Sequence, residues 1–209
     1  MLSLPRVALV ALFLFLAACT KPAVWAPEAD VLAARYVHPG PASISLFTIV
    51  SNSSGNGDHA ALMINASQRV LFDPAGSWRH PLSPERHDVH FGFTEAQLGR
   101  YTRYHARGSH RVRIQHLELP PETAETILAL AQRAGPVPNG HCARAIGAIF
   151  RQVPGLQHMP VAFHPNTLSN AFATIRGVRE ENVTSDAEPT RAQTYPGQSR
   201  IGPPELTAG

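Results

Sequence analysis

The chain is poor in cysteine and in charge. Its 209 residues include 2 cysteines, too few for a disulfide framework or an all-cysteine zinc site. Charged residues make up 16% of the chain, and 18 Lys and Arg against 15 Asp and Glu leave a net charge of +3. No run of Lys or Arg occurs, although a nucleic-acid interface needs clustered basic residues. We therefore expect no nucleic-acid partner.

Long apolar runs are also scarce, and the run at the N-terminus is too short to cross a bilayer as a helix. It covers residues 7–18 and follows Arg6, whereas a spanning helix needs about 20 apolar residues. One positive charge, an apolar stretch and then small residues are the layout of a signal peptide. We therefore expect residues 1–18 to be a signal peptide and the mature chain to begin at Cys19.

The residues that lead into Cys19 predict a lipid anchor. Leu16-Ala17-Ala18-Cys19 resembles the bacterial lipobox, whose cysteine receives a diacylglycerol thioether and becomes the new N-terminus. The resemblance implies a lipoprotein of the bacterial cell envelope, with Cys19 lipidated and held to the membrane by acyl chains such as palmitate. Thr20 stands where Asp often marks inner-membrane retention, which favours the periplasmic side of the outer membrane. An ordinary signal peptide with a chance cysteine is the alternative.

Lipidation of Cys19 would leave Cys142 as the only thiol of the mature chain. A lone cysteine in an oxidising compartment is a liability unless it is buried or used. Cys142 is therefore the first residue to consider as a functional group.

The remaining pattern indicates an α+β fold, with one domain over residues 42–178 in which a small antiparallel sheet packs against helices. Residues 19–41 are expected to be a tether with a short helix. Residues 179–209 lose apolar content and are expected to be a mostly disordered tail. β-branched and alternating segments predict strands, and apolar spacings of three and four predict helices. The expected strands are 44–50, 59–64, 69–73 and 110–119, and the expected helices are 94–105, 121–134, 142–153 and 165–172, with an irregular loop over 77–93.

Cys142 is expected at the start of a helix, directly after the turn Pro138-Asn139-Gly140-His141. The free N–H groups and the dipole of a helix N-terminus lower the pKa of a thiol. A thiolate is the nucleophile of cysteine catalysis, provided that a base and a group that orients this base lie beside it. The alternative is a small apolar residue buried on the inner face of the helix, where free cysteines commonly lie.

His59 and Asp73 are candidates for the base and its orienting group. His59 begins one strand of a predicted hairpin, and Asp73 ends the strand that pairs with it. Residues opposite one another in such a hairpin have Cβ atoms roughly 5 Å apart. A carboxylate at that position can fix the imidazole tautomer and stabilise the imidazolium. The alternative is that Asp73 is a turn residue before Pro74.

Three short segments carry a resemblance to a known family. Residues 58–64 (DHAALMI), 70–73 (VLFD) and 141–146 (HCARAI) resemble the permuted papain-like cysteine hydrolases, a branch of the NlpC-type superfamily that includes the lecithin retinol acyltransferase group and several bacterial lipoproteins. In this branch the histidine strand precedes the cysteine helix, as it does here. The resemblance covers roughly residues 42–175 and implies a circularly permuted papain-like core.

The resemblance also implies roles for the three residues. Cys142 matches the nucleophile, His59 the general base, and Asp73 the third polar position, where many relatives have histidine. The implied activity is that of a membrane-anchored cysteine hydrolase (peptidase or amidase) or acyltransferase. Its substrate would be a cell-wall peptide amide or a lipid ester, and no cofactor is expected. The alternative is a non-catalytic envelope lipoprotein that binds a lipid or cell-wall ligand on the same fold.

Histidines are plentiful, at 11 in the chain, and they raise a metal hypothesis. His80, His87 and His90 lie in one predicted loop, and three such residues are enough for a zinc site. However, no His-x-x-x-His pair lies on a predicted helix, and the loop has no firm scaffold. We therefore expect these histidines to be surface residues and assign no metal site.

Overall fold

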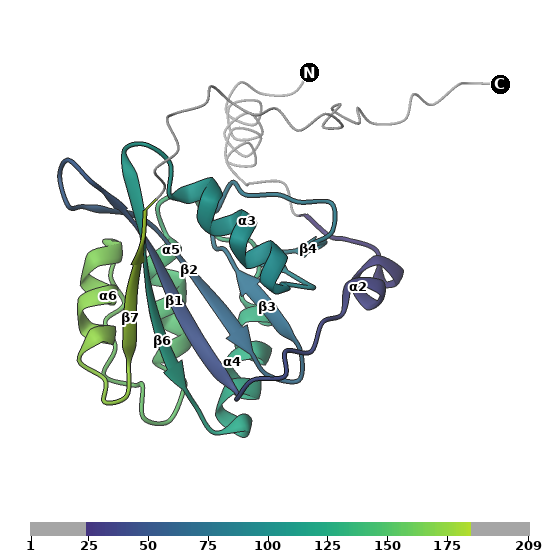
Figure 1. Cartoon of the computed structure of the whole chain (residues 1–209). Helices are drawn as coiled ribbons and strands as arrows, with labels where there is room; N and C mark the ends of the chain where they lie inside the picture. Colours follow the sequence, from purple (N-terminus) through teal and green to yellow (C-terminus); the bar gives the residue numbers. More distant parts are fainter. Residues whose placement is uncertain (1–23, 185–209) are drawn as a thin grey trace, which may run out of the picture.

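The computed structural model describes residues 24–184 as an α+β fold with a seven-stranded, wholly antiparallel sheet and five helices (Figure 1). The α+β class and the antiparallel sheet expected from the sequence are confirmed. The expected signal peptide 1–18, the lipidation site Cys19 and the chain from residue 185 onward lie outside the described residues.

The strands follow the order β4-β5-β3-β2-β1-β6-β7 across the sheet. β1, β2 and β6 are the longest strands, with nine residues each, and β1 and β2 form a hairpin at the centre of the sheet. The strand bounds are β1 Ser43–Ser51, β2 Gly57–Asn65, β3 Arg69–Phe72, β4 Glu85–Arg86, β5 Val89–His90, β6 His110–Glu118 and β7 Arg179–Val183.

The helices begin where the sequence provides a start signal. Thr94 caps one of them by accepting a hydrogen bond from the backbone N–H of Gln97, and prolines occupy the first positions of two others. The helix that starts at Cys142 ends at Phe150 rather than at the expected residue 153, and Arg151 and Gln152 continue as a turn that leads to Pro154. The helix bounds are α2 Glu28–Ala34, α3 Glu95–His105, α4 Pro121–Arg133, α5 Cys142–Phe150 and α6 Pro165–Ala173.

Both faces of the sheet are covered, so the structure has two cores. Ile44 and Leu46 of β1 point to the face that carries α4, α5 and α6. Phe47 and Ile49 of the same strand point to the opposite face, which carries α3 (Figure 1). Alternate side chains of a strand point to opposite faces, and burial on both explains the near-continuous apolar run of β1.

Two segments correct the sequence-based expectations. The loop over 77–93 contains the hairpin β4–β5, whose turn residues His87 and Asp88 both have positive φ, at 46° and 66°. The expected disorder from residue 179 is wrong for residues 179–183, which form the edge strand β7. Ion pairs between side chains of β6 and β7 hold this polar strand, Arg113 to Glu180 at 2.7 Å and Arg179 to Glu118 at 2.8 Å.

Candidate active site

Cys142 is the first residue of α5, and its side chain is 4% exposed. The turn before it requires Gly140, whose φ of +77° lies in the left-handed region. His141 completes this turn with a hydrogen bond from its ring Nδ1 to the carbonyl oxygen of Asn139, at 3.0 Å. The thiol therefore lies beside the free N–H groups of a helix N-terminus, as the sequence predicts.

α5 packs against β2, which is longer than its neighbour β3. β3 pairs with β2 only from Leu62 to Asn65, so the first half of β2 is not paired with β3. The backbone N–H groups of Ala60 in β2 and Ala143 in α5 both bond to the sulfur of Cys142 and lower its pKa. Two amides from different elements thus converge on the thiol.

His59 lies on the same stretch of β2 and joins Cys142 to Asp73. Its Nε2 is 2.7 Å from Asp73 Oδ1, and its ring is hydrogen-bonded to the Cys142 side chain. Because Nε2 faces the carboxylate, Nδ1 is the nitrogen left for the sulfur. The structure therefore brings together all three residues that the sequence singles out.

The contact between His59 and Asp73 is confirmed, but its geometry differs from the expected cross-strand pair. The ladder ends at Leu62 opposite Phe72, so Asp73 follows the last paired residue of β3. Continuing the register places Asp73 opposite Ala61, and His59 is its diagonal neighbour. A diagonal pair is still within reach of a side chain as long as histidine.

Tyr101 is a member of this site that the sequence did not indicate. Its hydroxyl donates to Asp73 Oδ1 at 2.9 Å, the same oxygen that faces His59. The ring is fully buried and makes edge contacts with Phe47, Trp78 and Phe93. A buried tyrosine needs a hydrogen-bond partner, but no local pattern indicates that this partner is 28 residues away in the chain.

Electrostatics favours a thiolate–imidazolium pair. Burial lowers the pKa of His59, but the Asp73 carboxylate and the hydrogen bond to Cys142 raise it to about 10. Burial raises the pKa of Cys142, but the hydrogen bond to His59 and its positive charge bring it below the usual value for a thiol. Burial also raises the pKa of Asp73, and the His59 imidazolium shifts it far below its usual range. Each charged form is thus stabilised by its neighbour.

His105 lines the site without sharing its charge. Its ring stacks on His59, with centroids 5.8 Å apart, and contacts Tyr101 at 4.4 Å. Burial lowers the pKa of His105 to about 4, which keeps it neutral at physiological pH. A second positive charge against the imidazolium of His59 is thereby avoided.

The loop histidines do not gather into a metal centre. His80 contacts Gln97 at 3.1 Å, the His87 ring packs at a tilt of 57° against Trp25, and His90 is fully buried against Trp78. Within residues 24–184, no group of three or more His, Cys, Asp or Glu side chains is placed to hold a metal ion. The expectation that all three are surface residues is wrong for His90.

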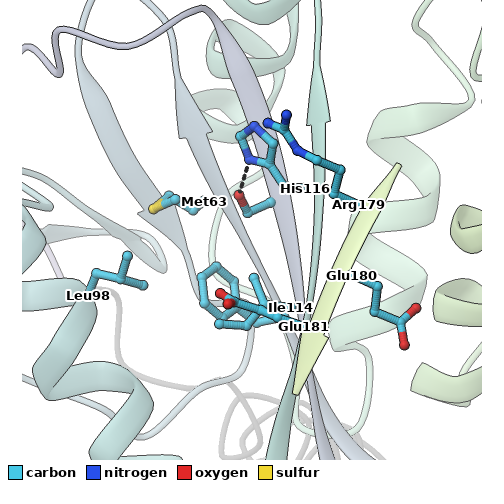
Figure 2. Close-up of a pocket in the computed structure, with 9 residues that line it drawn as sticks. Met63, Leu98, Ile114, His116, Arg179, Glu180 and Glu181 are labelled. Carbon is cyan, nitrogen blue, oxygen red and sulfur yellow. Dashed lines mark hydrogen bonds between the residues drawn. The ribbon is translucent and has the colours of Figure 1, made fainter. Parts of the chain in front are cut away.

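A pocket of about 450 Å³ lies on the sheet face that carries α3, away from the helix of Cys142. Figure 2 shows its apolar end formed by Met63 and Leu98, with His116 and Arg179 at its polar end. Ser45 and His116 are hydrogen-bonded there, with Oγ and Nδ1 3.1 Å apart.

No protein-family model, curated protein or solved structure matches this chain. None of the helices described here is long and apolar enough to cross a membrane.

Proposed function

We propose that this protein is a cysteine hydrolase or acyltransferase of the bacterial cell envelope that acts on an amide or an ester. The observation that carries the proposal is the hydrogen-bonded series Cys142–His59–Asp73. Its nucleophile, Cys142, is the first residue of a helix. A nucleophile, a base and a group that orients the base are the components of nucleophilic acyl transfer.

The first half of the reaction uses the thiolate of Cys142 and the proton held by His59. The sulfur attacks the substrate carbonyl carbon, and the carbonyl π electrons move to oxygen. The backbone N–H groups at the start of α5 are the donors available to the resulting oxyanion, and that of Ala143 already lies beside the sulfur. The C–N or C–O bond then breaks as the His59 imidazolium gives its proton to the leaving amine or alcohol. The acyl group remains on Cys142 as a thioester.

The second half regenerates the thiolate. His59, now neutral, takes a proton from water or from an acceptor alcohol or amine as this molecule attacks the thioester. The carbon–sulfur bond breaks, and the acid or the transferred product leaves. Asp73 keeps Nε2 protonated throughout, so that Nδ1 is the nitrogen that exchanges protons with sulfur and substrate.

The chain order of the site supports a circularly permuted papain-like core as part of the same proposal. His59 and Asp73 come from the hairpin β2–β3, and Cys142 comes from a later helix that packs on β2. The expected lipidation of Cys19 would hold this site at the membrane, where cell-wall peptides and lipid esters are both at hand.

Trapping the thioester tests the proposal. The protein is mixed with the p-nitrophenyl ester of a short fatty acid, quenched in acid and weighed by mass spectrometry. We expect one acyl group on the peptide that contains Cys142 and none on Cys142→Ala. An unmodified Cys142, with nitrophenol release equal in both proteins, would contradict the proposal.

A second candidate function is that of a binding lipoprotein, which the pocket on the opposite face of the sheet favours. In that case, ligand would be held between Phe47, Met63 and Ile114 without help from Cys142. Cys142→Ala distinguishes the two functions. The substitution would abolish turnover in an enzyme, but it would leave the affinity for the ligand unchanged in a binding protein.

A further inference from the structure

Exposed apolar side chains are concentrated in the first described part of the chain. Seven large hydrophobic residues among residues 24–184 are exposed, and four of these lie within residues 24–37. We call residues 24–37 the N-terminal strap. Its four exposed side chains are Val24, Trp25, Leu32 and Val37, and the other three are Leu82, Val161 and Phe163.

The strap is attached to the domain through its backbone, its polar side chains and the buried side chain of Val31. The N–H of Ala26 donates to the Glu85 carbonyl oxygen at 2.9 Å, and the Arg86 guanidinium binds Glu28 at 2.8 Å. Of the residues of α2, Val31 is buried and Leu32 is 61% exposed. The four large apolar side chains named above therefore stay exposed although the strap is packed on the domain.

Trp25 is held in an exposed position. Its side chain is 60% exposed, but the guanidinium of Arg86 lies 4.7 Å from the ring centroid and the His87 ring lies 4.8 Å away. The backbone of His87 also donates to the carbonyl oxygen of Val24, at 3.0 Å. Tryptophan is enriched at the boundary between membrane and water, where its amphipathic ring lies among the headgroups.

Chain length places this strap close to the expected anchor. Val24 is the fifth residue after Cys19, and five residues span at most about 18 Å when fully extended. With acyl chains on Cys19, the start of the strap cannot lie farther than this from the lipid headgroups. Tethering also makes membrane contact an intramolecular event, so weak apolar contacts suffice.

We propose that the strap is a membrane-docking surface, and that Trp25, Leu32 and Val37 insert among lipid headgroups and set the orientation of the domain. This inference rests on the lipid anchor of the proposed function. Glu28 and Asp30 outweigh the single basic residue Arg35 on the strap, so docking depends on apolar insertion and not on anionic lipid.

The test uses the full-length acylated protein in vesicles of phosphatidylcholine with brominated acyl chains, which quench a nearby tryptophan. The chain has 2 tryptophans, and Trp78 is 2% exposed in the core under α3. The signal that disappears in Trp25→Phe therefore belongs to Trp25. We expect this signal to fall at least twofold in brominated vesicles, with or without anionic lipid.

Two matched variants show whether the strap itself is responsible. Leu32→Ser with Val37→Ser should remove most of the quenching, whereas Val161→Ser, exposed outside the strap, should not change it. Protein that floats with the vesicles while the Trp25 signal stays bright would overturn docking and leave the anchor intact. Protein that does not float would overturn the anchor and the docking together. Cross-linking into pairs that Leu32→Ser abolishes, without quenching, would assign the strap to a second copy and also overturn the proposal.

Discussion

At the residue scale, one oxygen of Asp73 holds the candidate site together. Oδ1 of this fully buried carboxylate meets both His59 Nε2, at 2.7 Å, and the Tyr101 hydroxyl, at 2.9 Å. A buried charge is costly unless it is paired and hydrogen-bonded. The two partners stabilise the carboxylate, and the carboxylate in turn stabilises the imidazolium that the thiolate of Cys142 needs.

Asp73→Asn tests the pairing of charges. The amide keeps the size of the side chain but lacks the negative charge that stabilises the His59 imidazolium, so kcat/KM should fall on the order of 100-fold or more. The rate of acyl-enzyme formation is the measurement. Asp58→Asn is the matched control, because Asp58 lies next to His59 in the chain but pairs with His110 at the surface. Equal losses in the two variants would contradict the assigned role of Asp73.

Tyr101→Phe tests Tyr101 as a positioning residue. Loss of one hydrogen bond to a carboxylate, worth about 1.5 kcal/mol or more, should lower kcat about tenfold with little change in KM. The remaining charge on Asp73 is then less dispersed, so the alkaline limb of the pH–rate profile should move to higher pH. Tyr104→Phe, a hydroxyl removal on the exposed side of α3, should leave the profile unchanged. If the role of Tyr101 were purely structural, Tyr101→Phe would lower the stability of the protein without shifting the pH–rate profile.

At the element scale, the site depends on how closely the segment after β3 packs on itself. A Cβ at Gly76 would lie 1.9 Å from Asp73 Oδ2 and 2.7 Å from Oδ1. Asp73 is short, buried and held by two hydrogen bonds, so it cannot move aside without breaking them. The absence of a side chain at residue 76 therefore permits the carboxylate to face His59.

Gly76→Ala should disable the site by displacing Asp73. We expect the rate of Cys142 alkylation near pH 6.5 to fall about tenfold. The free energy of unfolding should fall by about 1–3 kcal/mol. Gly99→Ala is the control, because its Cβ would meet only the mobile end of Arg103 at 3.2 Å. Alanine there should be neutral or stabilise α3 by up to about 1 kcal/mol. If Cys142 is alkylated at the same rate in Gly76→Ala as in the unchanged protein, residue 76 does not control the position of Asp73.

Local patterns predicted most elements, because their signals lie within one segment. The apolar runs of β1 and β2 and the proline and threonine starts of α3, α4 and α6 have such signals. Hairpin β4–β5 lacked one, since its left-handed turn uses His87 and Asp88 where glycine or asparagine is usual. β7 also lacked one, because four of its five residues are polar and it is held mainly by its ladder and ion pairs with β6.

The same distinction holds for the candidate site, where only the residues with a local signal were predictable. Cys142, His59 and Asp73 stand at ends of predicted elements, where the chain order of a known family could be compared. Tyr101 and His105 lie on α3, and their approach to the site depends on how that helix crosses the sheet. Such tertiary placement is not encoded in any local spacing.

At the scale of the whole molecule, buried neutral histidines make stability depend on pH. His90 is fully buried, and burial lowers its pKa to about 4, against roughly 6.5 in an unfolded chain. Between these values the unfolded state binds the extra proton, so stability rises with pH. His105 titrates in the same direction, and its contribution adds to the slope.

The free energy of unfolding should therefore decrease as pH falls from 6.5 to 4. Each buried histidine contributes up to about 1.4 kcal/mol per pH unit. His90→Phe, which keeps a ring against Trp78, should make the slope shallower by one proton. Urea denaturation at four pH values measures this. A slope that is unchanged in His90→Phe would show that His90 does not titrate as described.

We infer that Cys142 and His59 form a thiolate–imidazolium pair, and the pH dependence of Cys142 alkylation is the sharpest test of this pair. A form that begins at Thr20 has Cys142 as its only thiol, and iodoacetamide is small enough to reach a nearly buried sulfur. We predict a thiolate pKa well below the usual value of about 8.5, rising toward that value in His59→Ala. A thiol with an ordinary pKa, or one that does not react, and that is indifferent to His59→Ala, would contradict the account and leave Cys142 as a residue of the core.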